Sequence, residues 1–328
     1  MGEITKAACI GGGVIGAGWA ARLLMNGIDV ALSDPSPAAG EFVEAALANA
    51  RSAWADLVDV PLPREGRLTL AASIGEAVAG AGLIVESVPE RLDIKQAVYA
   101  EVEAAVTPEV IIASSTSGIM PSDLQAKMAH PQRLVVAHPF NPVYLLPLVE
   151  IVAGEKTAQA TVDAAMAFYA SLGMKPLLVR KEIEAFIADR LLEAVWRESL
   201  WLVKDGVATT QDIDDAIRYG FGLRWAQMGL FETYRIAGGD GGMRHFLAQF
   251  GPCLSWPWTK LMDVPDLDDA LIETIAGQSD AQSGQHSIRE LMRLRDGNLV
   301  AILKALKERG HGAGETVGAY ERGLAAKS

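Results

Sequence analysis

The sequence Ala-Ala-Cys-Ile-Gly-Gly-Gly-Val-Ile-Gly occupies residues 7–16 and decides the expected fold of the first half of the chain. Residues 7–10 are expected to form a strand and residues 14–26 a helix, so the glycines fall at a strand-to-helix turn. In such a G-x-G-x-x-G turn the first glycine permits a tight bend, the second lets a pyrophosphate approach the backbone, and the third lets helix and strand pack closely. Amide groups at the helix start favour the anion. The residues expected to hold a dinucleotide here are Gly11, Gly12, Gly13, Val14, Ile15 and Gly16.

Asp34 stands at the end of the next expected strand, residues 29–34, and bears on the choice of nucleotide. A carboxylate at this place can accept hydrogen bonds from both ribose hydroxyls, whereas a 2′-phosphate would meet a like charge. The expected cofactor is therefore NAD rather than NADP. Flavins use the same fingerprint, and a glycine turn without a ligand is the structural alternative, so the motif alone indicates a nucleotide and no reaction.

The composition narrows the class of protein. The chain has 328 residues, 50% of them apolar, and its 29 basic and 41 acidic side chains leave a formal net charge of −12. This charge disfavours nucleic acid and anionic membranes as partners, and no apolar run is long enough to cross a membrane. Cys9 and Cys253 lack the spacing of a metal site or a disulfide framework. We expect a cytoplasmic protein that acts on a small molecule and binds no metal.

The order of the expected elements indicates an α/β fold. Short β-branched runs alternate with longer alanine-rich stretches of helical periodicity, which predicts an N-terminal, Rossmann-type, doubly wound and mainly parallel sheet. After residue 182 the chain changes to helices separated by glycine-rich turns, so we expect a NAD-binding domain over residues 1–182 and an all-α domain over residues 183–328. The tail from Arg309 to Ser328 fits no element clearly. Strands are expected at residues 7–10, 29–34, 83–88, 110–115, 134–138, 148–152 and 175–180, and helices at 14–26, 38–55, 94–106 and 157–172.

Polar side chains on or just after neighbouring expected strands suggest an active site. Ligands of doubly wound sheets bind outside the carboxyl ends of the strands, where Ser117 and His138 are expected to lie. Oxidation of an alcohol needs a base that removes the hydroxyl proton while hydride leaves the same carbon, and histidine serves near neutral pH. We expect His138 to be this base and Glu150 to orient it and stabilise the imidazolium. Ser117 is expected to bind the reacting oxygen, and Asn141 to hold substrate or the histidine loop.

These four residues also have purely structural explanations. A histidine can be a hydrogen-bonded core residue, a glutamate can end a strand at the surface, a serine can cap a helix, and an asparagine before proline can form a turn. The nucleotide turn favours the catalytic interpretation of His138, because a bound nicotinamide requires a partner group in the crevice. A serine hydrolase is disfavoured, since Ser117 lacks the G-x-S-x-G context.

Several further segments carry a family likeness: Glu86-Ser-Val-Pro-Glu90, the Ser-Thr-Ser run ending at Ser117, and His138-Pro-Phe-Asn-Pro. Together with the glycine turn and Glu150, they resemble the 3-hydroxyacyl-CoA dehydrogenase family over nearly the full length. The resemblance implies that the histidine and Glu150 form the catalytic pair and that Ser117 and Asn141 contact substrate. It also implies that the helical domain binds substrate and forms a homodimer. The residues it places near the cofactor are Glu90 and Lys95, and Ser115 is a further residue expected to bind the cofactor.

Two departures from the acyl-CoA pattern bear on the substrate. Residues 49–70 offer only Arg51, Arg64 and Arg67 where the family has a lysine-rich stretch for the CoA phosphates, so CoA is disfavoured. Asp189 replaces an asparagine of the family pattern. A neutral amide beside the reacting atoms has thus become a carboxylate.

Within the family, residues 141–150, 184–192 and 224–239 resemble the L-carnitine dehydrogenase branch. This implies oxidation of L-carnitine at C3 to 3-dehydrocarnitine with reduction of NAD. A quaternary ammonium cannot donate hydrogen bonds and is held by aromatic faces and carboxylates. The candidates for this contact are Phe140, Tyr144, Asp189, Glu193, Trp196 and Phe231, of which Asp189, Glu193 and Trp196 share one helical face.

Three alternatives stay open at this point. In the first alternative the acidic helix face is a solvated face whose carboxylates pair with Arg190 or Arg197. Another short 3-hydroxy acid, as in the gulonate 3-dehydrogenases, or a 3-hydroxyacyl-CoA is the alternative substrate. A dinucleotide-binding protein without turnover, of the kind found among structural crystallins, is the alternative from another class.

Overall fold

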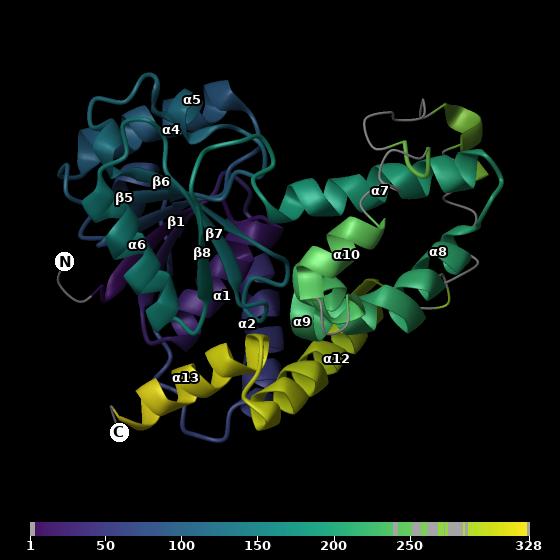
Figure 1. The fold of residues 1–328 in the computed structure, drawn as a ribbon. Coiled ribbons are helices and arrows are strands. Elements are labelled where there is room, and N and C mark those ends of the chain that lie inside the picture. The colour runs from purple at the N-terminus through teal and green to yellow at the C-terminus, as the bar shows by residue number, and fades with distance from the viewer. Residues whose placement is uncertain are drawn as a thin grey trace. The chain divides into compact units, whose positions relative to one another are not determined.

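The chain forms two compact units (Figure 1). The structure, a computed structural model, describes residues 4–238, 242–250, 257–260, 268–271, 273–274, 285 and 288–326. Unit 1 comprises Met1–Asp189 and Arg293–Ser328, and unit 2 comprises Arg190–Met292. Residues 293–328 thus belong in space with the sheet, although the sequence grouped them with the helical half.

Unit 1 is built on an eight-stranded sheet of order β3-β2-β1-β4-β5-β6-β7-β8. Neighbouring strands are parallel except β6 and β7, which are antiparallel, so the expected doubly wound and mainly parallel sheet is confirmed. The central strands are buried along their length because helices cover both faces. The strands are β1 (Lys6–Ile10), β2 (Asp29–Ser33), β3 (Leu68–Leu70), β4 (Leu83–Glu86), β5 (Ile111–Ser114), β6 (Leu134–Pro139), β7 (Leu148–Val152) and β8 (Lys175–Val179).

Two apolar clusters, one on each face of the sheet, form the core of unit 1. One cluster draws on α1 (Val14–Met25), α2 (Ala39–Leu57) and α6 (Gln159–Ser171). The other draws on α3 (Ile74–Val78), α4 (Leu92–Ala105) and α5 (Pro121–Gln125). The expected strands and helices are observed with ends within two residues of the expected bounds. The sequence missed β3, α3, α5 and the 3-10 turn Pro131–Arg133, which are too short to show a periodic pattern.

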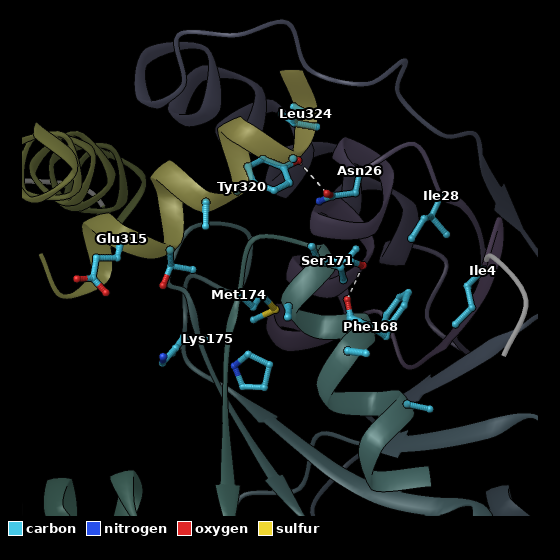
Figure 2. A pocket seen from close by; sticks show the side chains of 18 of the residues that line it. Ile4, Asn26, Ile28, Phe168, Ser171, Met174, Lys175, Glu315, Tyr320 and Leu324 are labelled. Carbon is cyan, nitrogen blue, oxygen red and sulfur yellow. Dashed lines mark hydrogen bonds between the residues drawn. The ribbon is translucent and has the colours of Figure 1, made fainter. Parts of the chain in front are cut away.

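The C-terminal part of the chain returns to unit 1 through α12 (Ile288–Arg309) and α13 (Ala313–Ala325). The α13 helix occupies the tail that the sequence left unassigned. Its Tyr320 packs edge-on against the ring of Trp54 and donates a 2.8 Å hydrogen bond to Asn26 at the end of α1. Figure 2 shows this bond at one side of a hollow between α6 and α13, with Phe168 and Met174 among its lining residues.

Unit 2 is helical where it is described, so the expected all-α second half is confirmed. Most of its described large apolar side chains are exposed, among them Tyr219 and Phe231. The α7 helix begins two residues before the unit boundary and carries Asp189 in its first turn. Its helices are α7 (Ala188–Lys204), α8 (Thr210–Ala216), the π-helix Ile217–Phe221, α9 (Gly222–Ala237) and α10 (Gly242–Phe250).

The structure also bears on the reactivity of the cysteines and on the possibility of a membrane-crossing helix. Burial raises the pKa of the Cys9 thiol to about 12, which keeps it protonated and unreactive, while Cys253 lies outside the described residues. Among the helices that the structure describes, none combines the length and apolarity that a membrane crossing requires.

Candidate active site

The site is built at the edge of the sheet where four parallel strands end. In the sheet register Ile10 of β1 lies opposite Glu86 of β4, and Glu86 lies opposite Ser114 of β5. The next strand, β6, runs parallel to β5 and ends at Pro139. The glycine turn, the loops after β4 and β5, and His138 therefore gather along one edge, where doubly wound sheets bind their ligands.

The glycine turn has the shape that a bound pyrophosphate requires. Gly11 has a φ of +95°, and a Cβ on Gly16 would lie 1.9 Å from the carbonyl oxygen of Gly11, so neither place tolerates a side chain. A Cβ on Gly13, by contrast, would meet nothing within 4 Å. The turn is thus closed toward the sheet and open at Gly13, at the start of α1. This open backbone with its helix N-terminus fits the NAD phosphates.

Asp34 stands directly after β2 and faces the same turn. One carboxylate oxygen accepts a 2.6 Å hydrogen bond from the Gly12 amide, and the other accepts a 2.7 Å bond from the Ser36 amide. Each oxygen has two lone pairs, so both can still accept a ribose hydroxyl. The half-buried position of Asp34 and its contact with the turn agree with the ribose-binding place expected from the sequence.

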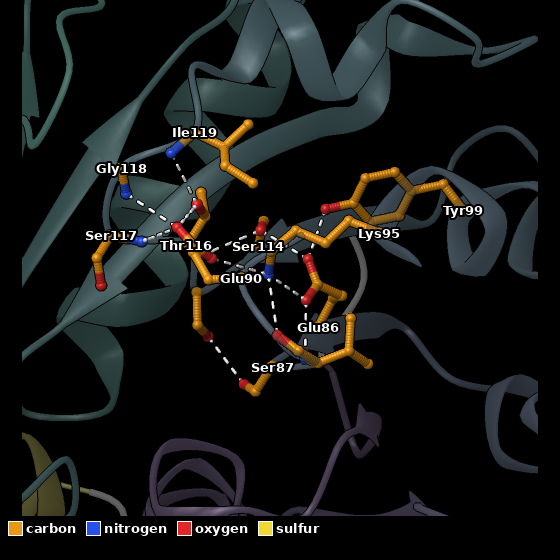
Figure 3. Close-up of polar contacts among 12 residues, drawn as sticks. Glu86, Ser87, Glu90, Lys95, Tyr99, Ser114, Thr116, Ser117, Gly118 and Ile119 are labelled. Atoms are coloured by element: carbon orange, nitrogen blue, oxygen red, sulfur yellow. Dashed lines mark hydrogen bonds and ion pairs between the residues drawn. The ribbon is translucent and has the colours of Figure 1, made fainter. Parts of the chain in front are cut away.

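A buried polar network fills the space between the loops after β4 and β5 (Figure 3). Lys95 on α4 and Glu86 at the end of β4 are each 1% exposed, and 2.7 Å separates Nζ from Oε1. The hydroxyls of Tyr99 and Ser114 donate to the other oxygen of Glu86. Burial, together with the charge of Glu86, raises the pKa of Tyr99 well above its ordinary value, so its phenol stays a donor. The buried side chains of the network thus satisfy one another's hydrogen-bonding groups.

Glu90 extends this network to the loop that carries Ser117. Its Oε1 accepts hydrogen bonds from the Thr116 hydroxyl and from the amides of Ser117 and Gly118, each amide at 3.0 Å, and its Oε2 lies 3.4 Å from Lys95 Nζ. Burial alone would raise the pKa of Glu90, but these donors and the lysine charge outweigh it and hold the pKa below its usual range. Figure 3 shows the Ser117 side chain directed away from Glu90, and Ser117 is an exposed residue.

Ser115 lies between the cofactor helix and the loop after β4. Its hydroxyl accepts a 3.0 Å hydrogen bond from the indole of Trp19 on α1 and lies 3.0 Å from the hydroxyl of Ser87. Ser115 thus joins the nucleotide helix to both loops that flank the site.

His138 and Glu150 form the centre of the candidate site. They are paired residues of β6 and β7, and 2.9 Å separates Nδ1 of the imidazole from Oε2 of the carboxylate. The histidine is 4% exposed and the glutamate is fully buried. Because Nδ1 faces Glu150, the other ring nitrogen, Nε2, is the one available to a substrate.

The second oxygen of Glu150 binds the start of α7. Its Oε1 accepts 2.9 Å hydrogen bonds from the amides of Ile187 and Ala188. Burial raises the pKa of Glu150, but the bonds from His138 and from the two amides outweigh it, so the pKa lies below its ordinary value. These two hydrogen bonds could not be predicted from the sequence, because nearly every residue type has the same backbone amide.

The segment before α7 is conformationally unusual. Ala185 and Phe186 have φ values of 59° and 50°, in the left-handed region that residues other than glycine seldom adopt. The ring of Phe186 is fully buried, and its centroid lies 5.5 Å from that of His138. Such backbone persists only where its surroundings hold it, and here the Phe186 ring is buried in the core while Glu150 binds the amides of the two residues that follow.

The structure brings three further expected residues to this part of unit 1. The Phe140 ring meets the imidazole edge-on at a centroid distance of 5.1 Å. Asp189 Oδ2 lies 3.5 Å from Nε2 of His138. Asn141 is exposed in the loop that follows β6. Phe140 and Asp189 thus contact the imidazole directly.

The other residues that were expected to contact the substrate are not shown in contact with His138. Tyr144 is 3% exposed in the core of unit 1, where its hydroxyl donates to Asp296 of α12, and this place does not favour a substrate contact. Glu193 lies 3.7 Å from Arg197 on α7, as the solvated-face alternative expects. The side chains of Trp196 and Phe231 are exposed. Because Glu193, Trp196 and Phe231 belong to unit 2, their substrate role stays a prediction.

The fold and the edge of the sheet together define the class: the chain carries the NAD binding domain of a dehydrogenase family. The family model for the 3-hydroxyacyl-CoA dehydrogenase NAD binding domain matches residues 6–183, and the model for the C-terminal domain matches residues 186–264. The chain belongs to the 3-hydroxyacyl-CoA dehydrogenase family, which confirms the resemblance drawn from the sequence.

Individual relatives are similar over most of the chain. A protein of Agrobacterium fabrum described as L-carnitine dehydrogenase/betainyl-CoA thioesterase is 62% identical over 98% of this chain, which spans 66% of that longer protein. An L-carnitine dehydrogenase of Mesorhizobium japonicum is 60% identical over 98% of this chain and 89% of its own length. The solved structure of an NAD-dependent 5-formyl-3-hydroxy-2-methylpyridine 4-carboxylic acid 5-dehydrogenase is 32% identical, with a TM-score of 0.78 over 93% of this chain and 99% of that one.

Proposed function

We propose that the protein oxidises the C3 hydroxyl of L-carnitine to the ketone of 3-dehydrocarnitine and reduces NAD. The chemistry rests on one observation, the 2.9 Å contact between Nδ1 of His138 and Oε2 of Glu150 at the strand ends. The choice of substrate is supported by the similarity to the relatives described as L-carnitine dehydrogenases.

His138 is the general base in this proposal. Its Nδ1–H donates to Glu150, so Nε2 carries the lone pair that accepts the C3 hydroxyl proton. As the O–H bond breaks and the Nε2–H bond forms, the electron pair left on oxygen forms the carbonyl. NAD, when bound, supplies the acceptor for the hydride that leaves C3.

Glu150 holds the base in its reactive form. Its depressed pKa keeps the carboxylate ionised throughout the neutral range, so it fixes the tautomer and stabilises the imidazolium. Its two bonds to the α7 amides fix the carboxylate in turn. The base is therefore oriented by a group that is itself immobile.

Ser117 and Asn141 are proposed to position the substrate. Ser117 is exposed on a loop whose backbone is held by Glu90, so its hydroxyl can donate to the C3 oxygen. Lys95 is buried between Glu86 and Glu90. We infer that Lys95 acts on this loop and does not contact the nucleotide.

NAD is proposed to lie over the glycine turn, with its pyrophosphate at Gly13 and its ribose at Asp34. The open face at Gly13 and the remaining lone pairs of Asp34 support this place. Ser115, bonded to the first helix and close to both flanking loops, supports the edge on which the nicotinamide would rest.

A homodimer formed through unit 2 is part of the proposal. The described helices of this unit expose large apolar side chains, as an association surface does. Examples are Leu191, Leu192, Tyr219 and Phe231. Sedimentation of the purified protein at a mass of two chains would support the dimer, and a single-chain mass at micromolar concentration would contradict it.

A comparison of substrates tests the proposed function. Initial rates of NADH formation are measured with L-carnitine, L-gulonate and 3-hydroxybutyrate at equal concentrations. We expect L-carnitine to have the largest kcat/KM by at least an order of magnitude, because a site that binds its cation discriminates against tails that lack the charge. A preference for gulonate or 3-hydroxybutyrate would contradict the substrate, and no turnover of any of them would contradict the activity.

A further inference from the structure

His138 has a carboxylate beside each of its ring nitrogens. Besides Glu150 at Nδ1, the carboxylate of Asp189 lies 3.5 Å from Nε2, and Asp189 is 24% exposed in the first turn of α7. The uncharged rings of Phe140 and Phe186 also lie against the imidazole. The reacting nitrogen therefore faces a negative charge from α7, while the opposite nitrogen faces one from β7.

The charge of the proposed substrate explains why a second carboxylate, that of Asp189, is needed beside His138. In carnitine the quaternary nitrogen is joined to C3 through a single methylene, so a permanent positive charge lies beside the carbinol. When His138 takes the hydroxyl proton, an imidazolium forms close to that charge, and two like charges at this separation repel strongly where water is excluded. Glu150 lies on the far side of the ring and is already paired with Nδ1.

We propose that Asp189 is a catalytic residue that supplies the counter-charge for the imidazolium at Nε2 while the substrate cation is bound. This inference rests on the proposed function, because it takes His138 as the base. No proton passes to Asp189: the O–H bond breaks, the Nε2–H bond forms, and the carboxylate stabilises the resulting positive charge. The N-terminal end of α7 favours an ionised carboxylate at this place.

The test compares Asp189→Asn with Asp189→Glu. The asparagine keeps the approximate shape and removes the charge, whereas the glutamate keeps the charge on a longer side chain. Asp163→Asn on the exposed surface of α6 is the matched control, since it removes the same charge away from the site. For each protein kcat and KM are measured from pH 5 to pH 10 with L-carnitine and with 3-hydroxybutyrate.

We expect Asp189→Asn to lower kcat about 100-fold for L-carnitine but only about 10-fold for 3-hydroxybutyrate, which brings no cation. The pH at which kcat/KM reaches half its plateau should fall, because the imidazolium has lost a stabilising charge. Asp189→Glu should restore most of both effects, and Asp163→Asn should change neither. An increase in KM with an unchanged kcat would overturn the inference and leave Asp189 a binding residue. Equal losses on both substrates without rescue by glutamate would overturn it in favour of a structural role.

One measurement separates this inference from the choice of substrate. NMR follows the titration of the His138 ring in the protein without substrate, with the signal assigned by its loss in His138→Gln. We expect the titration midpoint to lie at lower pH in Asp189→Asn than in the wild type. An unchanged midpoint would overturn the role of Asp189 whatever the substrate is. A shifted midpoint in a protein that does not oxidise L-carnitine would leave the counter-charge standing and contradict only the proposed substrate.

Discussion

His138 and Glu150 lie directly opposite each other on β6 and β7. These two strands are the one antiparallel pair of the described sheet, in which all other neighbouring strands are parallel. A reversal of chain direction after His138 brings Glu150 back beside it at the ligand-binding edge. The connecting loop is fixed to the nucleotide helix, because the buried guanidinium of Arg22 donates to the carbonyl oxygens of Val143 and Leu146. The pairing of base and carboxylate is therefore built into the sheet and held by the helix that carries the glycine turn.

The depressed pKa values of two carboxylates of the site, Glu150 and Glu90, predict a loss of stability in acid. Because the folded-state pKa of Glu150 and Glu90 lies below the usual value of about 4.3, each stabilises the fold above that pH and loses its contribution as pH falls through the folded pKa. We expect the free energy of unfolding in urea to decline from pH 5 to pH 3. In Glu150→Gln the decline should be shallower, since one titrating group has been removed. An identical pH dependence in both proteins would show that Glu150 is not responsible.

Two glycines of the same turn should respond differently to alanine. In Gly16→Ala the new methyl group would lie 1.9 Å from the carbonyl oxygen of Gly11, so we expect a markedly lower melting temperature. In Gly13→Ala it meets no protein atom within 4 Å, and the melting temperature should stay near that of the wild type. The Gly13 variant should nevertheless bind NAD at least about 10-fold more weakly, because its methyl group occupies the pyrophosphate approach. NAD binding is measured by calorimetric titration. If the Gly13 variant bound NAD as tightly as the wild type, the cofactor would lie elsewhere.

The buried Lys95–Glu86 pair predicts a stability effect that a second substitution should reverse. Lys95→Met leaves Glu86 charged and 1% exposed, and loss of one partner of a buried ion pair costs about 3–5 kcal/mol. The double variant Glu86→Gln/Lys95→Met has no buried charge and should regain part of this loss. Urea denaturation measures both. Equal stability of the single and double variants would indicate that the charge of Glu86 is not the cause.

The nucleotide half of the site was predictable because each of its parts is local in sequence. The glycine turn, Asp34 and the strand-end position of His138 follow from spacing and periodicity over short stretches. The direction of β7 was not predictable, since a strand pattern carries no sign of parallel or antiparallel pairing. The register that places Glu150 opposite His138 therefore came from the structure.

The remaining parts depend on contacts between distant segments. The carbonyl oxygens bound by Arg22, the amides of Ile187 and Ala188, and the approach of Asp189 to Nε2 involve backbone groups or the start of a helix, which leave no local pattern. Tyr144 was expected near the substrate from its distance to His138 along the chain, but its contacts lie in the core with Asp296. Closeness in sequence did not predict the side of the loop that this residue faces.

The most direct test of the account is the turnover of His138→Gln with L-carnitine and NAD. Glutamine cannot take up the hydroxyl proton but is close to histidine in size, so we expect kcat to fall by about two to four orders of magnitude while the calorimetric affinity for NAD stays within about 2-fold. Turnover within a few-fold of the wild type, at unchanged NAD affinity, would show that His138 is not the base.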